Sequence, residues 1–236
     1  MRFEPPLLEA RLLKRYKRFL ADVQPAGSGP MTVHCPNTGS MLGCAEPGMR
    51  VWLSRATNPE RKYAWTWELV EAQPDILVGI HTGRTNSLVQ EAVAAGVIPE
   101  LAGYRNLRAE VTAGEGFRVD FLLTGHVRRP DCYLEVKNVT AAVSGGRALF
   151  PDAVSERASR YLRELMAKVR EGQRAILCFC VQRDDVREVC PADEIDSVYG
   201  RTLRQAAATG VEICAYVARI TPHEAALYRP VPVRLA

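Results

Sequence analysis

Charged side chains occur in two short stretches that otherwise have the composition of buried strands. The first, residues 117–123, carries Asp120, and the second, residues 132–138, carries Glu135 and Lys137. Charges are almost never buried without a partner. Glu135 and Lys137 are two residues apart and therefore share one face of a strand, which Asp120 joins if the strands pair. Such a group can hold a divalent cation through oxygen ligands and place a lysine beside an activated water.

The Glu-x-Lys spacing is a weak signal by itself, because a second copy occurs at Glu60-Arg-Lys62. That copy lies in a Pro-containing loop, and the nearest upstream aspartate, Asp22, is too distant to sit on the other half of a hairpin. Asp120, in contrast, precedes Glu135 by one hairpin's length. A satisfied ion pair on a half-buried sheet explains the spacing about as well as a catalytic site does, so both interpretations stay open here.

Helices and strands that position this cluster are expected from about residue 82 onward. A first helix is predicted to begin with Thr85 or Asn86 as its N-cap and to end at Ala95 before Gly96. A second, long helix is predicted after the cap residue Ser155. The remaining predicted elements are strands at 107–111, 117–123, 132–139, 175–181 and 211–217, a helix at 199–209 and a short last helix from Thr221.

Short strands dominate the first 80 residues and favour a small β-barrel. The predicted strands are 7–23, 31–35, 49–54, 63–71 and 76–80. With basic and aromatic residues available, an OB-type barrel that binds nucleic acid is a reasonable expectation. The change of periodicity predicts two domains, residues 1–80 and 81–236.

Composition is ordinary for a globular protein, with 236 residues of which 47% are hydrophobic and 25% charged. No apolar run approaches the ~20 residues that a membrane helix needs, so no membrane partner is expected. Seven cysteines without a Cys-x-x-Cys pair favour reduced thiols, and the N-terminal stretch has no apolar signal core, so we expect a cytoplasmic location. The sequence leaves the oligomeric state open, with a homodimer as one option.

Basic residues gather in the first 20 residues, which hold six Lys/Arg against two Glu. Such a patch suits the phosphates of a polyanion, although an isolated patch is more often a solvated face. The candidates for phosphate contacts are Lys14, Arg15, Lys17 and Arg18.

Two tight polar turns could also hold phosphates through backbone N–H and hydroxyl groups. One contains Asn37, Thr38 and Ser40, and the other runs from Thr82 to Thr85. Arg84 and Asn86 could reach a backbone phosphate at the start of the first predicted helix. From the residues alone, ordinary turn chemistry is the stronger interpretation of both turns.

The order of the elements around the cluster resembles that of the PD-(D/E)XK nuclease superfamily. Its core is α-β-β-β-α-β, with Asp on the second strand and (Asp/Glu)-x-Lys on the third, which corresponds to Asp120, Glu135 and Lys137 here. Further acids or Gln often come from the first helix and the fourth strand. Glu91 and Gln182 resemble those additions.

Several stretches, spread nearly end to end, resemble the sugar fermentation stimulation protein A (SfsA) family. They are residues 14–23, 34–41, 82–86, 134–140, 148–154, 181–183 and 191–196. The resemblance implies an N-terminal OB-like β-barrel followed by an α/β PD-(D/E)XK-like domain with a mixed central sheet. It also implies DNA binding with little sequence preference and a regulatory link to sugar (maltose) metabolism. One departure is His81, where an Asn is expected.

Three functions follow as hypotheses. In the first, Asp120 and Glu135, helped by Glu91, hold Mg²⁺ or Mn²⁺ in a phosphodiesterase site, Lys137 orients the water and Gln182 places the lysine or the water. In the second, the chain is a non-enzymatic DNA-binding regulator and the cluster is a relict. The third is an OB-type module for RNA or another polyanion. Whether the chain is an enzyme is not decided by its sequence.

Overall fold

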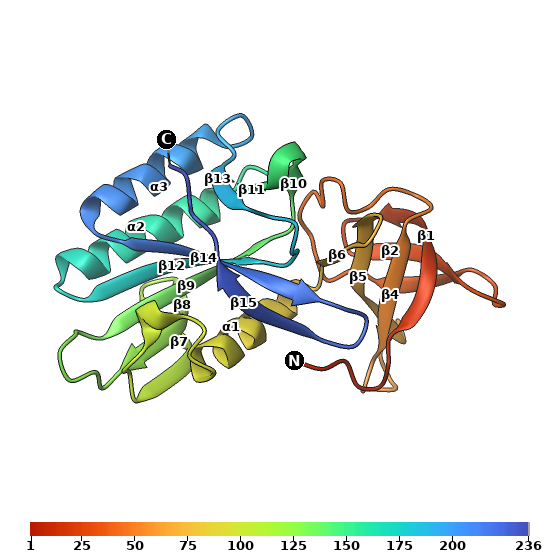
Figure 1. Ribbon diagram of the computed structural model, residues 1–236, viewed down its shortest axis with the longest axis horizontal. Coiled ribbons are helices and arrows are strands. Elements are labelled where there is room, and N and C mark those ends of the chain that lie inside the picture. Colours follow the sequence, from red (N-terminus) through yellow and green to blue (C-terminus); the bar gives the residue numbers. More distant parts are fainter. Residues whose placement is uncertain (236) are drawn as a thin grey trace.

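A small barrel forms the N-terminal part of the chain in the computed structural model, which describes residues 1–235 (Figure 1). Its strands lie in the order β3-β2-β1-β4-β5-β6, and an additional pairing of β3 with β5 closes the sheet. Leu12, Val33, Leu53 and Trp67 fill the interior. The strands are β1 (Leu8–Tyr16), β2 (Leu20–Pro25), β3 (Met31–His34), β4 (Arg50–Arg55), β5 (Trp65–Gln73) and β6 (Ile76–Gly79).

The single strand predicted for residues 7–23 is wrong, because β1 and β2 form an antiparallel hairpin instead. The chain reverses at Lys17 and Arg18, which have φ values of 50° and 65°. Left-handed backbone is uncommon for residues other than Gly, Asn and Asp. The turn therefore carries none of the residues from which a turn is normally predicted.

The second part of the chain is built on a six-stranded mixed sheet of order β15-β14-β12-β9-β8-β7. The strands β9, β12 and β14 run parallel, while β7, β8 and β15 join antiparallel at the edges. The central strand β12 is buried on both faces, as its apolar sequence predicted. The bounds are β7 (Asn106–Gly114), β8 (Phe117–Thr124), β9 (Cys132–Val139), β12 (Arg174–Val181), β14 (Glu212–Ile220) and β15 (Ala225–Pro230).

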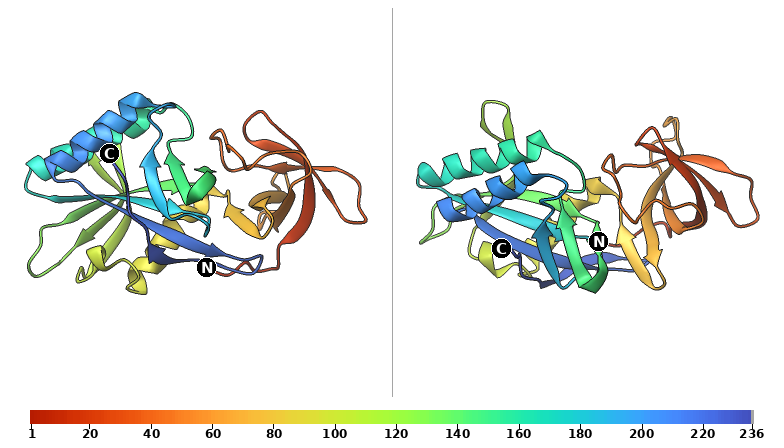
Figure 2. Two further views of the ribbon diagram at one scale, coloured as in Figure 1. Left: turned by 45° about the horizontal axis from the view of Figure 1, so that its top comes forward. Right: turned by 90° about the horizontal axis from the view of Figure 1, so that it is seen from above.

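Helices cover the two faces of this sheet (Figure 2). The helix α1 (Thr85–Ala94) packs on one face through Leu88 and Val89. The helices α2 (Glu156–Arg170) and α3 (Ser197–Thr209) pack on the other through residues such as Leu162 and Leu203. The prediction of a small barrel followed by a mixed-sheet α/β part is thereby confirmed.

A three-stranded sheet lies beside the long helices, with the order β10-β11-β13. Its strands were not predicted, since β10 (Ala142–Val143), β11 (Arg147–Phe150) and β13 (Glu188–Pro191) have at most four residues each. Such short strands leave little periodicity to read.

The predicted cap of α2 is confirmed, because Ser155 Oγ accepts a hydrogen bond of 3.2 Å from Ala158 N. The predicted side-chain cap of α1 is wrong, because a 3₁₀ turn, Thr82–Arg84, leads into the helix and no side chain caps it. The hydroxyl of Thr85 instead accepts from Gln182, and Asn86 donates to Asp120. Both candidate caps are used in tertiary contacts.

The short helix predicted from Thr221 is also wrong, because Thr221 lies in the turn between β14 and β15. Its hydroxyl accepts hydrogen bonds from the backbone N–H groups of His223 and Glu224, at 3.2 and 3.0 Å. This local side-chain bonding stabilises a turn in preference to a helix.

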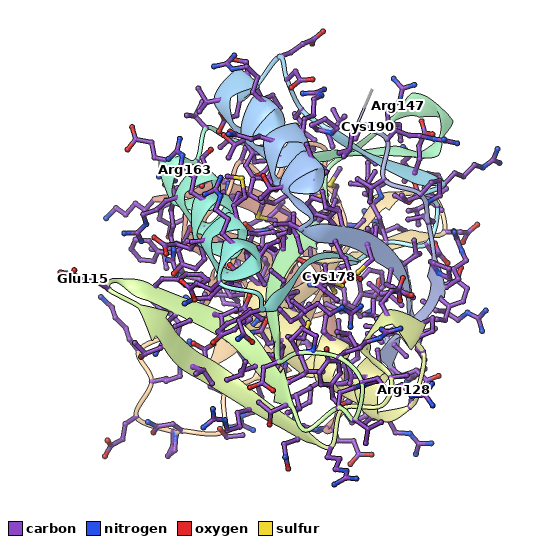
Figure 3. The ribbon with its side chains drawn as sticks, turned by 90° about the vertical axis from the view of Figure 1, so that its left-hand side faces the viewer. Glu115, Arg128, Arg147, Arg163, Cys178 and Cys190 are labelled. Carbon is purple, nitrogen blue, oxygen red and sulfur yellow. The ribbon has the colours of Figure 1, made fainter. Side chains whose placement is uncertain are left out.

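All seven cysteines are free thiols, and six of them are buried. Figure 3 shows Cys178 in the interior of the sheet, whereas Arg128, Arg147 and Arg163 project from the outside. Among the described residues, no helix is long and apolar enough to cross a membrane.

Candidate metal centre

Asp120 and Glu135 are brought together by the pairing of β8 with β9. The two strands are antiparallel with Phe121 opposite Leu134, so Asp120 and Glu135 are the next residues in the register. The backbone N–H of Val136 donates to Asp120 Oδ2 at 2.7 Å. The Asp120 carboxylate is thus held against β9, as the predicted hairpin requires.

Glu135 and Lys137 lie on the same face of β9, with Lys137 Nζ 2.6 Å from Glu135 Oε1. Glu135 is only 3% exposed, and its second oxygen, Oε2, is buried without a hydrogen-bond partner. Burial raises the pKa of Glu135 to about 7, and the charge of Asp120 adds to this effect while Lys137 opposes it. A buried carboxylate oxygen without a partner is costly and calls for a ligand.

Asn86 holds the outer oxygen of Asp120. Its Nδ2 donates to Asp120 Oδ1 at 2.9 Å and lies 3.5 Å from Glu110 Oε1. Glu110 sits on β7 with a φ of 55° and pairs with Arg118 at 2.8 Å. The amide of Asn86, expected to reach a phosphate, is here a positioning group for Asp120.

Two cations of α2, Arg157 and Arg160, join Lys137 of β9 around the ring of Tyr161, and the sequence did not single them out. Lys137, Arg157 and Arg160 all lie over the ring of Tyr161, at 5.0, 5.1 and 5.6 Å from its centroid. Arg157 Nη2 also donates to Tyr161 Oη at 3.1 Å, and this hydrogen bond is the main reason why the pKa of Arg157 is raised. The only available signal was the i, i+4 spacing of Arg157 and Tyr161 on a predicted helix.

Gln182 lies next to the cluster but has different contacts from those expected. Its Nε2 donates to Asn138 Oδ1 at 2.6 Å and to Thr85 Oγ1 at 3.2 Å. The backbone oxygen of Gln182 accepts from Gly79 N at 2.9 Å. Gln182 therefore ties β9 to the start of α1 and to the last strand of the barrel, and its side chain bonds to Asn138, the residue after Lys137.

Glu91 is not brought into the cluster. Its side chain is about half exposed, and Glu91 Oε2 is 2.6 Å from the amino group of Met1. The structure shows no contact by which Glu91 would help to hold a metal at the cluster, because its carboxylate lies on the outward face of α1 and binds the N-terminus of the chain.

The two basic residues at the tip of the β1–β2 hairpin, Lys17 and Arg18, are exposed. Lys14 Nζ, in contrast, lies 3.3 Å from Asp22. The Arg15 guanidinium donates to backbone oxygens of Asn37 and Gly39 at 3.0 and 2.8 Å, which fixes the polar turn from inside. Of the four basic candidates, only the pair at the hairpin tip is thus free of such engagement among the described residues.

The polar turn that follows β3 is joined to the second part of the chain. Ser40 Oγ and Met41 N donate to Asp152 Oδ2 at 3.0 and 3.1 Å. Asn37 is buried, and its Oδ1 accepts from Gly39 N at 2.8 Å, while Thr38 is exposed. Thr38 and Ser40 are both exposed, but Ser40 is bonded to Asp152, so Thr38 is the exposed candidate of this turn without a side-chain hydrogen bond among the described residues.

Arg84 was expected to contact a DNA phosphate, but its side chain forms an ion pair within the protein. Its Nη2 and Nε lie 2.8 and 3.2 Å from the two carboxylate oxygens of Glu68, which is 1% exposed. His81, at the position where Asn was expected, has a buried Nδ1 without a partner, and burial lowers its pKa.

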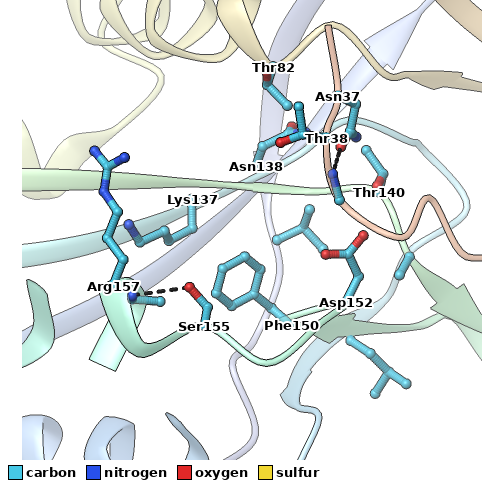
Figure 4. Close-up of a pocket in the computed structure, with 15 residues that line it drawn as sticks. Asn37, Thr38, Thr82, Lys137, Asn138, Thr140, Phe150, Asp152, Ser155 and Arg157 are labelled. Carbon is cyan, nitrogen blue, oxygen red and sulfur yellow. Dashed lines mark hydrogen bonds between the residues drawn. The ribbon is translucent and has the colours of Figure 1, made fainter. Parts of the chain in front are cut away.

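A cavity of about 390 Å³ opens beside Lys137 (Figure 4). Lys137 and Arg157 lie at one end of it, and Asn37 and Thr38 of the barrel lie at the other. The cavity is also lined by Thr82, Asn138, Thr140, Phe150, Asp152 and Ser155. Of the charged cluster, Lys137 lines this recess, which the two parts of the chain share, whereas Asp120 and Glu135 are not among its lining residues.

The donor set fits a divalent cation that prefers oxygen. Glu135 Oε2 has no hydrogen-bond partner in the described part of the chain. The second carboxylate, that of Asp120, lies on the adjacent strand and accepts hydrogen bonds from Asn86 and Val136. Among the described residues there is no group of three His, Cys, Asp or Glu side chains arranged to hold a metal. Mg²⁺ usually keeps several waters and is bound through one or two carboxylates plus substrate phosphates, so two carboxylates are a sufficient protein donor set for that ion.

Comparison with known proteins gives matches along nearly the whole chain. Residues 13–80 match the family model described as SfsA N-terminal OB domain, and residues 83–224 match the one described as sugar fermentation stimulation protein RE domain. The expectation of an OB-like barrel is confirmed by the first match.

Curated relatives align over the full length. The chain is 58% identical over 237 residues to a sugar fermentation stimulation protein homolog of Thioalkalivibrio sulfidiphilus, covering 100% of this chain and 99% of the relative. It is 56% identical over 235 residues to a homolog of Alkalilimnicola ehrlichii, covering 99% of each.

Among solved structures, SfsA of Pyrococcus furiosus in complex with Ca²⁺ superimposes with a TM-score of 0.88 at 23% sequence identity. The match covers 99% of this chain and 98% of that one. At this level of identity, the similarity establishes a common fold.

Proposed function

From the premise that this chain belongs to the sugar fermentation stimulation protein (SfsA) family, we propose that it is a DNA-binding protein with little sequence preference and a divalent-metal phosphodiesterase site. The site is formed by Asp120, Glu135 and Lys137. The observation that carries the proposal is the Oε2 atom of Glu135, which is buried without a partner beside a second carboxylate. Lys137 binds the other oxygen of Glu135, and among the described residues no group donates to Oε2, which a cation could bind.

Each protein group around the cluster has a distinct task. A bound Mg²⁺ or Mn²⁺ would supply Lewis-acid stabilisation of phosphate oxygens and lower the pKa of a water. Lys137 orients the attacking water and stabilises negative charge on the phosphorus centre. Arg157 adds a second positive charge at the same end of the cavity. Asn86 fixes Asp120, and Gln182 fixes the end of β9 through Asn138.

The related structure supports a cation of this type. The protein from Pyrococcus furiosus is described as a complex with Ca²⁺, an ion that takes oxygen ligands. For the present chain, the same ligand chemistry is available from the two carboxylates.

The direct test is calorimetric titration of Mg²⁺ and Mn²⁺ into the wild type and into the Asp120→Ala/Glu135→Ala variant, with plasmid DNA incubated in parallel. We expect metal binding and nicking by the wild type, and neither by the variant. Glu91→Ala is the matched control, because Glu91 contacts Met1 and should leave both signals unchanged. Metal-dependent cleavage that survives in the double variant contradicts the proposal.

A non-enzymatic DNA-binding regulator is the second candidate, and one observation favours it. Lys137 already lies 2.6 Å from Glu135, so the cluster can also serve as a structural ion pair. In that case DNA binding weakens steeply with salt and is indifferent to Mg²⁺. Competition between DNA and RNA then tests whether the barrel prefers RNA, and the connection to sugar metabolism remains a matter for transcription assays.

A further inference from the structure

We propose that the cavity beside Lys137 takes one unpaired nucleotide of a DNA strand, so that the substrate class of the site is single-stranded or locally unpaired DNA. The inference rests on the proposed function, because it places the scissile strand at the same lysine. It adds a feature that would determine which DNA is bound: the recess that the barrel and the mixed sheet form together, next to the charged cluster.

The size of the cavity excludes paired bases. Its volume of about 390 Å³ is at the small end of ligand pockets. The major groove of DNA is by itself about 12 Å wide, so a duplex cannot enter. Enzymes that enclose a nucleotide in a pocket therefore act on single strands or flip the nucleotide out of the stack.

The recess is built into the fold and does not depend on a loose gap between the two parts. Thr82 Oγ1 donates to the backbone oxygen of Pro36 at 2.9 Å, and Ser40 and Met41 bind Asp152 from the other side. A Cβ atom at Gly39 would lie 2.7 Å from Asp152 Oδ2, so a larger residue there would have to displace the Asp152 carboxylate from its present position. The barrel loop is therefore fixed as one wall of the cavity before any ligand arrives.

The polarity of the recess matches that of a nucleotide. At one end lie two cations, Lys137 and Arg157. Lys137 is paired with Glu135 at 2.6 Å, whereas Arg157 has no carboxylate within ion-pair distance among the described residues, so Arg157 is the cation left for a phosphate. At the other end, the hydroxyl of Thr38 and the carboxylate of Asp152 can accept hydrogen bonds from base amino groups. A phosphate on the cations thus directs its sugar and base toward the barrel loop.

Thr38 offers the cleanest test, because it is exposed and lines the cavity without holding the loop. Binding of a short labelled oligonucleotide is measured by fluorescence anisotropy in EDTA, as a single strand and as the blunt duplex of the same sequence. We expect the wild type to bind the single strand about tenfold or more tightly, and Thr38→Leu to lose about tenfold of that affinity through added bulk. Thr57→Leu, at another exposed barrel threonine, should retain it.

Equal affinity for both forms, or a Thr38→Leu variant that binds like the wild type while remaining folded by circular dichroism, overturns the inference. Displacement of the strand by an equal nucleotide concentration of deoxynucleoside monophosphate identifies a free nucleotide as the ligand and overturns the strand assignment. Cleavage is scored separately with Mn²⁺. If Thr38→Leu cleaves duplex DNA like the wild type, the inference is contradicted but the proposed function is not. If the protein prefers single strands but binds no metal, the phosphodiesterase proposal is contradicted but the nucleotide recess is not.

Discussion

At the scale of single residues, Glu135 is a carboxylate whose burial costs free energy of folding. The carboxyl group is 3% exposed, has one oxygen on Lys137 and has another without a partner. Burial therefore works against its ionised form, and the pKa is raised to about 7. Without a ligand this carboxyl group is costly to ionise, and a bound cation would stabilise its ionised form. A carboxyl group with such a shifted pKa is typical of a functional position.

The first prediction concerns the pH dependence of stability in EDTA. Between about pH 4.5 and pH 7, the folded chain keeps the Glu135 proton that the unfolded chain has already lost. The free energy of unfolding contributed by this group therefore falls as pH rises through that window, by roughly 2–4 kcal/mol, and is constant above it. Urea unfolding of Glu135→Gln should lack this slope.

Glu194→Gln provides the control, because Glu194 is an exposed acid. It should follow the wild-type curve. Parallel pH profiles for the wild type and Glu135→Gln would show that Glu135 titrates normally. The same ionisation predicts that Mg²⁺ affinity increases as pH rises through about 7.

A second prediction tests the positioning role of Asn86. Its amide holds Asp120 Oδ1 at 2.9 Å, so Asn86→Ala frees the carboxylate to rotate. Loss of such an outer partner typically weakens metal binding by about 10–100-fold. Calorimetry with Mn²⁺ measures the change. The control is Asn106→Ala, which removes an exposed amide from β7 and should bind Mn²⁺ like the wild type. An unchanged Kd for Mn²⁺ in Asn86→Ala would contradict the positioning role.

At the scale of elements, the site depends on where strands and the first helix meet. The strands β8 and β9 supply the carboxylates, and the start of α1 supplies Asn86. The start of α1 is fixed in turn by Arg84, whose guanidinium reaches Glu68 on β5 of the barrel. Strand β5 of the barrel is thus bonded to the residue that precedes α1, the helix that packs on the mixed sheet.

The third prediction follows from that ion pair. Glu68 is 1% exposed while Arg84 is 39% exposed, so Arg84→Ala leaves a buried carboxylate without its cation. We expect the free energy of unfolding in urea to fall by about 1–3 kcal/mol, less than for a fully buried pair because Arg84 is partly solvated. In a double-mutant cycle, adding Glu68→Gln should recover part of the loss, and strictly additive effects would show that the two residues do not interact.

At the scale of the whole molecule, the barrel and the mixed sheet share one cavity and are tied at several points. The backbone bond from Gly79 to Gln182 and the bonds from the barrel turn to Asp152 cross between them. The exposed basic residues Lys17 and Arg18 lie at the turn of the β1–β2 hairpin, and Arg15 ties the backbone oxygen of Arg18 to those of Asn37 and Gly39. We therefore expect these two cations to add phosphate contacts to those made at Lys137 and Arg157.

The fourth prediction tests whether Lys17 and Arg18 contact DNA phosphates. On duplex DNA, each phosphate that a cationic side chain neutralises adds about 0.9 to the magnitude of the slope of log K against log salt. Lys17→Ala/Arg18→Ala removes two such cations and should therefore reduce this magnitude by about 2. Arg170→Ala/Arg201→Ala, at exposed positions on α2 and α3, should leave the slope unchanged. Equal slopes for both double variants would exclude the hairpin tip from the DNA interface.

From the sequence alone, the order of most strands and helices and the shared face of Glu135 and Lys137 could be predicted. These features are local: a period of two places residues i and i+2 on one side, and an apolar run such as 175–181 must be buried. The family resemblance added the OB-like barrel, which the chain contains. Where local signals conflicted, as in the hairpin that reverses at Lys17 and Arg18, the prediction failed.

Only the tertiary structure decided which candidate groups are free and which are engaged. Arg84, Arg15 and Glu91 look equally available in a sequence, but their partners lie on other elements or at the chain terminus. Arg157 became part of the site because α2 packs against β9. Side-chain partners at long sequence separation are set by packing, and burial, which raises the pKa of Glu135, depends on atoms that no local pattern specifies.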